Sequence, residues 1–204
     1  MVEAQLRRRN IRDERVLRAM QEIPREEFVP VESRVVSYRD DPIHIGYGQT
    51  ISQPYMTALM AESLALTGTE TVLEVGAGCG YAAAVLGALA RRVISVEIIA
   101  GLVQQARENL RRTARDANVE VVAGDGSLGY AESAPYDAIS VAAGAPDIPV
   151  SLLEQLNDPG RLVIPVDERD DQELRVVWKD SGRIDYRVAT LCRFVPLRGG
   201  KGWR

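Results

Sequence analysis

Residues 74–80 read Glu-Val-Gly-Ala-Gly-Cys-Gly, a carboxylate followed by glycines at every second position. The apolar, partly β-branched residues 71–75 predict a buried strand, and the alanine-rich residues 81–90 predict a helix. Glycine is needed where a backbone turns tightly and where a ligand approaches it closely. In a doubly wound sheet, such a turn between strand and helix is the usual place for a nucleotide-like ligand.

The spacing of the glycines separates classes of ligand. A dinucleotide fingerprint has its third glycine three residues after the second, where this chain has Tyr81. The acid inside the strand, Glu74, suits a ligand with a cationic end better than a pyrophosphate. The run resembles the first motif of methyltransferases that use S-adenosylmethionine. A nicotinamide or flavin site and a structural glycine turn remain alternatives at this point.

Two further acids follow the ends of later strands. Residues 92–97 predict a strand that ends at Glu97, where a carboxylate accepts hydrogen bonds from ribose hydroxyls. Residues 119–123 predict the next strand, and Asp125 follows it between two glycines, where it would lie beside an adenine amino group. Open α/β sheets bind ligands at the carboxyl ends of their strands. Glu74, Glu97 and Asp125 together therefore favour S-adenosylmethionine.

The elements that position these residues predict an α/β fold. We expect a doubly wound, mostly parallel, seven-stranded Rossmann-like sheet with a C-terminal antiparallel hairpin and N-terminal helices packed on it. Further strands are expected at 136–141, 161–165 (closed by Pro165), 174–178 and 186–195, and helices at 2–22 (its second part capped by Asp13), 54–66, 102–112 and 151–156. The chain should form one domain, with N-terminal helices and an active-site loop (1–53), a cofactor-binding core (54–166) and C-terminal strands and tail (167–204).

Composition limits the classes of protein. The 204 residues are 46% hydrophobic and 26% charged, which is ordinary for a soluble globular protein. The net charge of −4 predicts no basic groove for nucleic acid, and no apolar run predicts a membrane span. Two cysteines, Cys79 and Cys192, cannot form a disulfide framework, which favours the cytoplasm. The single histidine, His44, excludes two-histidine zinc sites, and no metal is expected.

Residues 49–54, Gln-Thr-Ile-Ser-Gln-Pro, precede a predicted helix, and Pro54 suits its first turn. Either Ser52 or Thr50 caps this helix and does nothing more, or these hydroxyls line the ligand crevice. The residues alone leave both interpretations open.

Several runs carry a more specific resemblance: residues 48–54, 73–81, 124–126, 162–165 and 194–197. Through them the chain resembles the protein-L-isoaspartate O-methyltransferases over nearly its whole length. The resemblance implies methyl transfer from S-adenosylmethionine to the free carboxylate of L-isoaspartyl residues, with S-adenosylhomocysteine as the other product. The methyl ester would collapse to a succinimide, whose hydrolysis returns some normal aspartate. The expected partners are isoaspartyl peptides and proteins, and the expected state is a monomer.

The resemblance also implies roles for individual residues. Ser52 would be the active-site residue, and residues 195–197 would line the peptide site. The implied cofactor contacts are Gln49, Thr50, Ile51, Ser52, Glu74, Val75, Gly76, Gly78, Gly80, Glu97, Ile98, Asp125 and Gly126, and the implied substrate contacts are Ile51, Ser52, Val195, Pro196 and Leu197.

The chemistry requires no more than these groups. A carboxylate is already ionised at neutral pH, so that methyl transfer to it needs no general base. Alternatives are an aspartate O-methyltransferase for one dedicated peptide and a non-catalytic module that binds isoaspartyl peptides or S-adenosylmethionine. A nicotinamide oxidoreductase is disfavoured by Tyr81 at the required glycine position.

Overall fold

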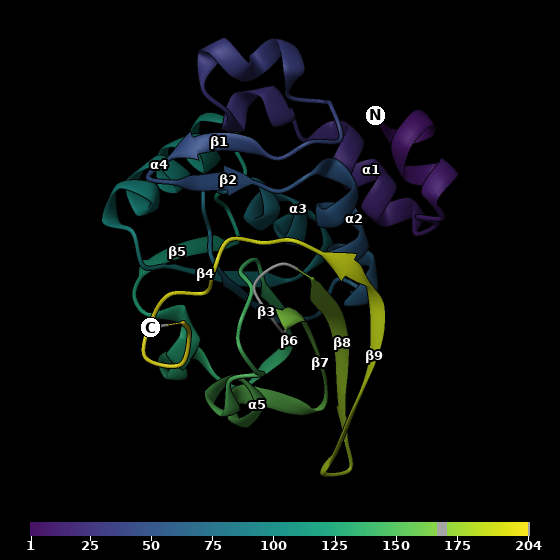
Figure 1. The fold of residues 1–204 in the computed structure, drawn as a ribbon, viewed down its shortest axis with the longest axis vertical. Helices are drawn as coiled ribbons and strands as arrows, with labels where there is room; N and C mark the ends of the chain where they lie inside the picture. The colour runs from purple at the N-terminus through teal and green to yellow at the C-terminus, as the bar shows by residue number, and fades with distance from the viewer. Residues whose placement is uncertain (167–170, 204) are drawn as a thin grey trace.

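The computed structural model describes residues 1–166 and 171–203, and one large sheet organises them (Figure 1). Its seven strands lie in the order β5-β4-β3-β6-β7-β8-β9. Pairing is parallel from β5 to β7 and antiparallel from β7 to β9, which confirms the predicted sheet and its C-terminal hairpin. The strands are β3 (Thr71–Val75), β4 (Arg92–Glu97), β5 (Val119–Ala123), β6 (Tyr136–Val141), β7 (Leu156–Val166), β8 (Gln172–Asp180) and β9 (Arg183–Cys192).

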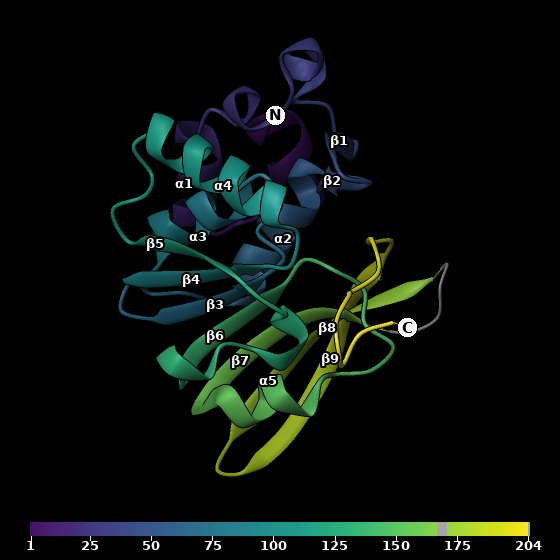
Figure 2. The ribbon, with the colours of Figure 1, turned by 90° about the vertical axis from the view of Figure 1, so that its left-hand side faces the viewer.

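Helices cover both faces of this sheet (Figure 2). On one face, apolar side chains of α1 to α4 form a cluster with Val72, Val93 and Ala138 of the sheet. On the other face, Leu152 of α5 packs with Leu73 and Ile139. The α-helices are α1 (Glu14–Glu22), α2 (Pro54–Ser63), α3 (Tyr81–Leu89), α4 (Ala100–Arg112) and α5 (Val150–Gln155). No helix in the described ranges is long and apolar enough to cross a membrane.

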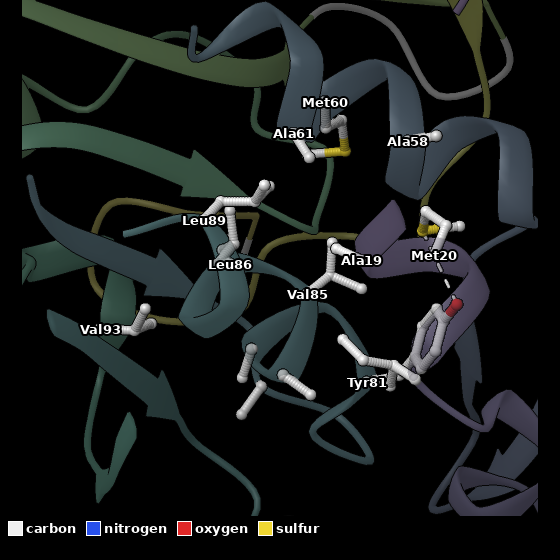
Figure 3. Close-up of a cluster of buried hydrophobic side chains, with 14 of the residues drawn as sticks. Ala19, Met20, Ala58, Met60, Ala61, Tyr81, Val85, Leu86, Leu89 and Val93 are labelled. Carbon is white, nitrogen blue, oxygen red and sulfur yellow. Dashed lines mark hydrogen bonds between the residues drawn. The ribbon is translucent and has the colours of Figure 1, made fainter. Parts of the chain in front are cut away.

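The first cluster joins the N-terminal helices to the core (Figure 3). Met20 of α1 and Tyr81 of α3 are both fully buried, and the Tyr81 hydroxyl lies 3.6 Å from the Met20 sulfur. Met60 of α2 and Leu86 of α3 complete the contact between the helices. The packing fixes where α2 begins, and thus where the preceding loop lies.

The N-terminal region differs from the single helix predicted over 2–22. A π-helical turn (Val2–Leu6) and a 3₁₀ turn (Arg7–Arg9) come first, and Asn10 in a left-handed conformation ends them. The Asp13 side chain then accepts hydrogen bonds from the N–H groups of Arg15 and Val16, which confirms it as the cap of α1.

Residues 24–48, the lead-in to the active-site loop, contain regular structure that the sequence did not predict. Two 3₁₀ turns (Arg25–Phe28 and Val31–Val36) precede a two-stranded antiparallel sheet of β1 (Ile43–Gly46) and β2 (Gln49–Ile51). His44 is exposed on β1, opposite Thr50 in the register.

The end of β7 corrects a second expectation. Pro165 does not close the strand, because Val166 continues it and pairs with Glu173 of β8. β9 ends at Cys192, earlier than the predicted 195. Two short 3₁₀ turns, Gly126–Leu128 and Ala131–Ser133, link β5 to β6. The boundary predicted at residue 167 falls outside the described residues, and the division of the domain into three parts stays a prediction.

Candidate functional site

A cavity opens at the carboxyl ends of β3, β4 and β6 and encloses about 800 Å³, its open mouth included. β3 and β6 are neighbours in the sheet, but the chain leaves β3 through α3 on one face and leaves β6 toward α5 on the other. Such a point of divergence is where open α/β sheets bind ligands. Most of the residues singled out from the sequence line this cavity: Gln49, Thr50, Ile51, Ser52, Val75, Gly76, Gly78, Glu97, Ile98, Gly126, Val195, Pro196 and Leu197.

The glycine turn forms one side of the cavity through its backbone. Gly76 has φ +94°, a conformation that L side chains rarely adopt, and its N–H donates to the Val96 carbonyl at 2.8 Å. The Glu97 carboxylate accepts from the N–H groups of Gly78 and Ile99, each at 2.9 Å. Glu97 therefore stays fixed at the end of β4 and holds the turn in place.

Two of the predicted glycines act by close packing. Gly126 lines the cavity, and a Cβ on it would lie 2.5 Å from Val75 Cγ1. Gly80 is not on the cavity wall. It lies at the start of α3 with φ +90°, where a Cβ would be 3.2 Å from the Ala106 carbonyl of α4. Gly80 therefore positions the turn from behind.

Glu74 is likewise absent from the cavity wall, because it lies beneath it and is 1% exposed. The Ser95 hydroxyl donates to one carboxylate oxygen, and the other, Oε1, is buried without a partner among the described residues. Burial raises the pKa of Glu74 to about 8.

The Asp125 carboxylate already has partners in the folded chain and is not on the cavity wall. Its Oδ1 accepts from the N–H and hydroxyl of Ser127, and its Oδ2 accepts from the Gly200 N–H at 2.7 Å. Desolvation opposes these bonds, but the pKa of Asp125 lies below its ordinary value. The C-terminal tail thus reaches back to the end of β5.

The opposite side of the cavity begins with residues 49–52. Of the two interpretations left open for this segment, capping of α2 by Ser52 or Thr50 is wrong: Gln53 is the N-cap residue, and its side chain makes no capping bond. Asp40 caps the helix instead, because its Oδ1 accepts a hydrogen bond from the Tyr55 N–H at 3.0 Å. The Ser52 hydroxyl makes no hydrogen bond within the described part of the chain and lies on the cavity wall.

Residues 195–198 complete this side, although they come from the other end of the chain. Leu197 N–H donates to the Gly144 carbonyl, and Gly144 N–H donates to the Val195 carbonyl, both at 2.8 Å. The Trp203 indole N–H also reaches the Gly144 carbonyl at 2.8 Å. The segment is therefore held against the loop after β6.

Several cavity residues were not predicted. Thr57, Ala82, Leu102 and Arg198 carry no motif signal of their own, and Ala77, Cys79 and Tyr81 belong to the run 73–81 but were assigned no contact. Also on the wall are Val96, Ile99, Ala142 and Ala143. Ala142 and Ala143 follow β6, so the convergence of strand ends could have identified them.

Proteins of one family resemble this chain over nearly its whole length. A family model described as protein-L-isoaspartate(D-aspartate) O-methyltransferase matches residues 1–202. Protein-L-isoaspartate O-methyltransferase of Methanoculleus marisnigri is 50% identical over 205 residues, covering 100% of this chain and 92% of the relative. Protein-L-isoaspartate O-methyltransferase 2 of Marinobacter nauticus is 52% identical over 206 residues, covering 100% and 93%.

Solved structures agree with the sequence relatives. A protein-L-isoaspartate O-methyltransferase superposes with a TM-score of 0.84 at 30% identity, over 96% of this chain and 64% of its own. A Plasmodium falciparum protein of the same description, in complex with S-adenosyl-L-homocysteine, superposes with a TM-score of 0.79 at 28% identity, over 94% of both chains. The chain therefore belongs to the protein-L-isoaspartate O-methyltransferase family, and the predicted S-adenosylmethionine-dependent methylation of isoaspartyl carboxylates is confirmed.

Proposed function

We propose that the cavity holds S-adenosylmethionine along the glycine turn and receives the isoaspartyl carboxylate beside Ser52. The observation that carries this assignment is that the glycine turn and the Ser52 loop, on separate segments of the chain, line one cavity. S-adenosylmethionine supplies an activated methyl group when bound, so the protein's task is to bind, orient and exclude water.

The residues beneath and beside the turn suit this cofactor. The unpartnered Oε1 of Glu74 is a costly buried polar atom, and the proposal requires a cationic or N–H-bearing end of the ligand to reach it beneath the cavity wall. Each carboxylate oxygen of Glu97 accepts one hydrogen bond, from the N–H of Gly78 or of Ile99. Each oxygen can therefore still accept a second hydrogen bond from a ribose hydroxyl. Asp125 accepts three bonds from the chain, and the fourth acceptor position suits an adenine amino group.

Ser52 orients the acceptor carboxylate through its free hydroxyl. A neutral donor is well suited to this step, because the acceptor loses its charge as the methyl group is transferred. A strong cation in direct contact would stabilise the bound carboxylate more than the transition state. Ile51 and residues 195–197 supply apolar surface that keeps water from the reacting atoms.

Cys79 lines the same cavity but does not compete as a methyl acceptor. Burial raises the pKa of its thiol to about 11, so that the thiol stays protonated at neutral pH. The thiolate is the nucleophilic form of cysteine. The site can therefore methylate a carboxylate selectively even though a cysteine lines it.

The decisive experiment offers labelled S-adenosylmethionine to two short peptides that differ only in L-isoaspartate or normal aspartate at one position. We expect base-labile label on the isoaspartyl peptide alone. Label on the aspartyl peptide would favour an aspartate O-methyltransferase for a dedicated peptide, and binding without label would favour a non-catalytic module.

A Ser52→Ala variant tests the role of this residue. We expect turnover to fall by a factor that corresponds to about 1.5–3 kcal/mol, the value of a hydrogen bond to a charged group. The affinity for S-adenosylhomocysteine should stay close to that of the wild type. A wild-type turnover number would refute the assignment.

Two coarser expectations complete the proposal. Cys79 and Cys192 are free thiols, one buried and one half-buried, which supports a reducing compartment such as the cytoplasm.

We also propose that the chain acts as a monomer, because one chain supplies both sides of the cavity. Light scattering at working concentration tests this state.

A further inference from the structure

Arg25 is a buried cation close to the candidate acceptor site. Its relative exposure is 0%, although arginine is almost never fully buried without a partner. Nε donates to the Ser37 carbonyl and Nη2 donates to the Ser52 carbonyl, each at 2.7 Å. The side chain therefore ties the lead-in directly to the loop that carries the free Ser52 hydroxyl.

The groups around Arg25 leave part of its charge uncompensated. The guanidinium carbon lies 4.9 Å from the ring centroid of Tyr81, a residue on the cavity wall. Nη1 is buried without a hydrogen-bond acceptor, and the ion pairs among residues 1–166 and 171–203 include none to Arg25. Desolvation lowers the pKa of Arg25, as expected for a cation buried without an ion pair.

We infer that Arg25 is a positioning residue for methyl transfer: it fixes the main chain at Ser52 so that the hydroxyl faces the acceptor carboxylate. This inference rests on the role proposed above for Ser52. The guanidinium holds two carbonyls in one planar fork, a geometry that lysine cannot reproduce.

Arg15 provides a control for the loss of backbone anchoring alone, although Arg15 is exposed and Arg25 is buried. It also joins two main-chain carbonyls from separate segments, those of Leu66 at 2.5 Å and Leu89 at 2.9 Å. It does not line the cavity. An effect of Arg25 that arises only from lost backbone anchoring should appear in both Arg15→Met and Arg25→Met.

The experiment measures methyl transfer to the isoaspartyl peptide by the full chain with Arg25→Met, Arg25→Lys, Arg15→Met, Ser52→Ala and the Ser52→Ala/Arg25→Met double variant. We expect Arg25→Met to lower kcat roughly 10- to 100-fold, the scale that misplacement of a catalytic group produces. Arg25→Lys should be intermediate, and Arg15→Met should keep the wild-type kcat. The Kd for S-adenosylhomocysteine should change less than about threefold in each, since an unaffected contact leaves binding near its original value.

The double variant separates positioning from general damage. If Arg25 acts through the Ser52 hydroxyl, Arg25→Met should add little to Ser52→Ala, because coupled residues are non-additive. The same fold-loss in both backgrounds, an equal loss in Arg15→Met, or a wild-type kcat in Arg25→Lys would overturn the inference. The lysine variant keeps the test valid if the methionine variant does not fold.

The controls also distinguish this inference from the proposals on which it rests. No label on the isoaspartyl peptide with the wild type would refute the proposed function. A wild-type rate for Ser52→Ala would refute the role of Ser52 and this inference together. A slow Ser52→Ala with an additive Arg25→Met would refute this inference alone.

Discussion

The two sides of the cavity are built in different ways. The strand-end wall, residues 75–79, 96–98 and 126, follows consecutive strands whose parallel register brings their carboxyl ends together. The arm wall, residues 49–52 and 195–198, comes from opposite ends of the chain. It depends on contacts from elsewhere: Arg25 to Ser52, Asp40 to the start of α2, and Gly144 to residues 195 and 197.

Because of this difference, substitutions in the two walls should have different consequences. The strand-end wall is a backbone structure packed directly on the core, so alteration there should damage folding and cofactor binding together. The arm wall is attached through individual hydrogen bonds, so alteration there should affect substrate handling more than global stability.

Gly80→Ala should have the largest effect on stability. The substitution forces φ +90° on alanine and brings its Cβ to 3.2 Å from the Ala106 carbonyl. Backbone strain and overpacking each cost about 1–3 kcal/mol, so the unfolding free energy should fall by about 2–6 kcal/mol. Urea unfolding measures this change.

The control for Gly80 is Gly182→Ala in the turn between β8 and β9. Gly182 has φ +75°, but nothing lies within 4 Å of the point that a Cβ would occupy there. It should lose only the backbone contribution, about 1–3 kcal/mol. Equal losses at both glycines would mean that packing of the turn against α4 contributes nothing.

Glu74→Gln should have the next largest effect, and the effect should depend on pH. The native pKa of about 8 lies above the ordinary 4.5, so the folded state keeps a proton that the unfolded state releases between these values. The contribution of Glu74 to stability therefore falls as pH rises from about 4.5 to about 8. Glutamine does not ionise, so the variant should gain on the order of 3–4 kcal/mol relative to wild type at pH 8 compared with pH 5.

Urea unfolding at both pH values tests this prediction, with Glu120→Gln as the control. Glu120 is exposed on β5 and pairs with Arg92 at 2.9 Å, so its substitution should show no comparable trend. The Glu74 variant should also bind S-adenosylhomocysteine more weakly. A pH-independent difference from wild type would show that Glu74 is already ionised in the free protein.

The sequence predicted the strand-end wall well because its signals are local. β3, β4, β5 and β6 have the predicted bounds, since apolar and β-branched runs mark buried parallel strands. The carboxyl ends of such strands must meet, which brought Glu97 and Gly126 to the cavity. The extended β7 was missed because residues 157–160, Asn-Asp-Pro-Gly, have the composition of a turn. The strand is extended by the pairing of Leu156 with Tyr136 and of Gly160 with Lys179.

The arm wall could be predicted only through the family resemblance. Nothing in residues 49–54 reveals that Asp40 caps α2 and leaves Ser52 free, because that contact depends on the path of the lead-in. The burial of Arg25 also depends on tertiary packing, since its neighbours Pro24 and Glu26 suggest an exposed turn.

Trp203→Phe should have the smallest effect and should act on the arm wall alone. The change keeps an aromatic ring but removes the indole N–H that donates to the Gly144 carbonyl at 2.8 Å. A neutral hydrogen bond contributes about 1 kcal/mol, so KM for the isoaspartyl peptide should rise roughly fivefold while kcat stays near wild type. Trp178→Phe in β8 makes the same chemical change away from the cavity and should leave KM unchanged. Because Leu197 and Trp203 share the Gly144 carbonyl, a fall in kcat with an unchanged KM would mean that the tail orders the reacting groups and does not merely hold the peptide side.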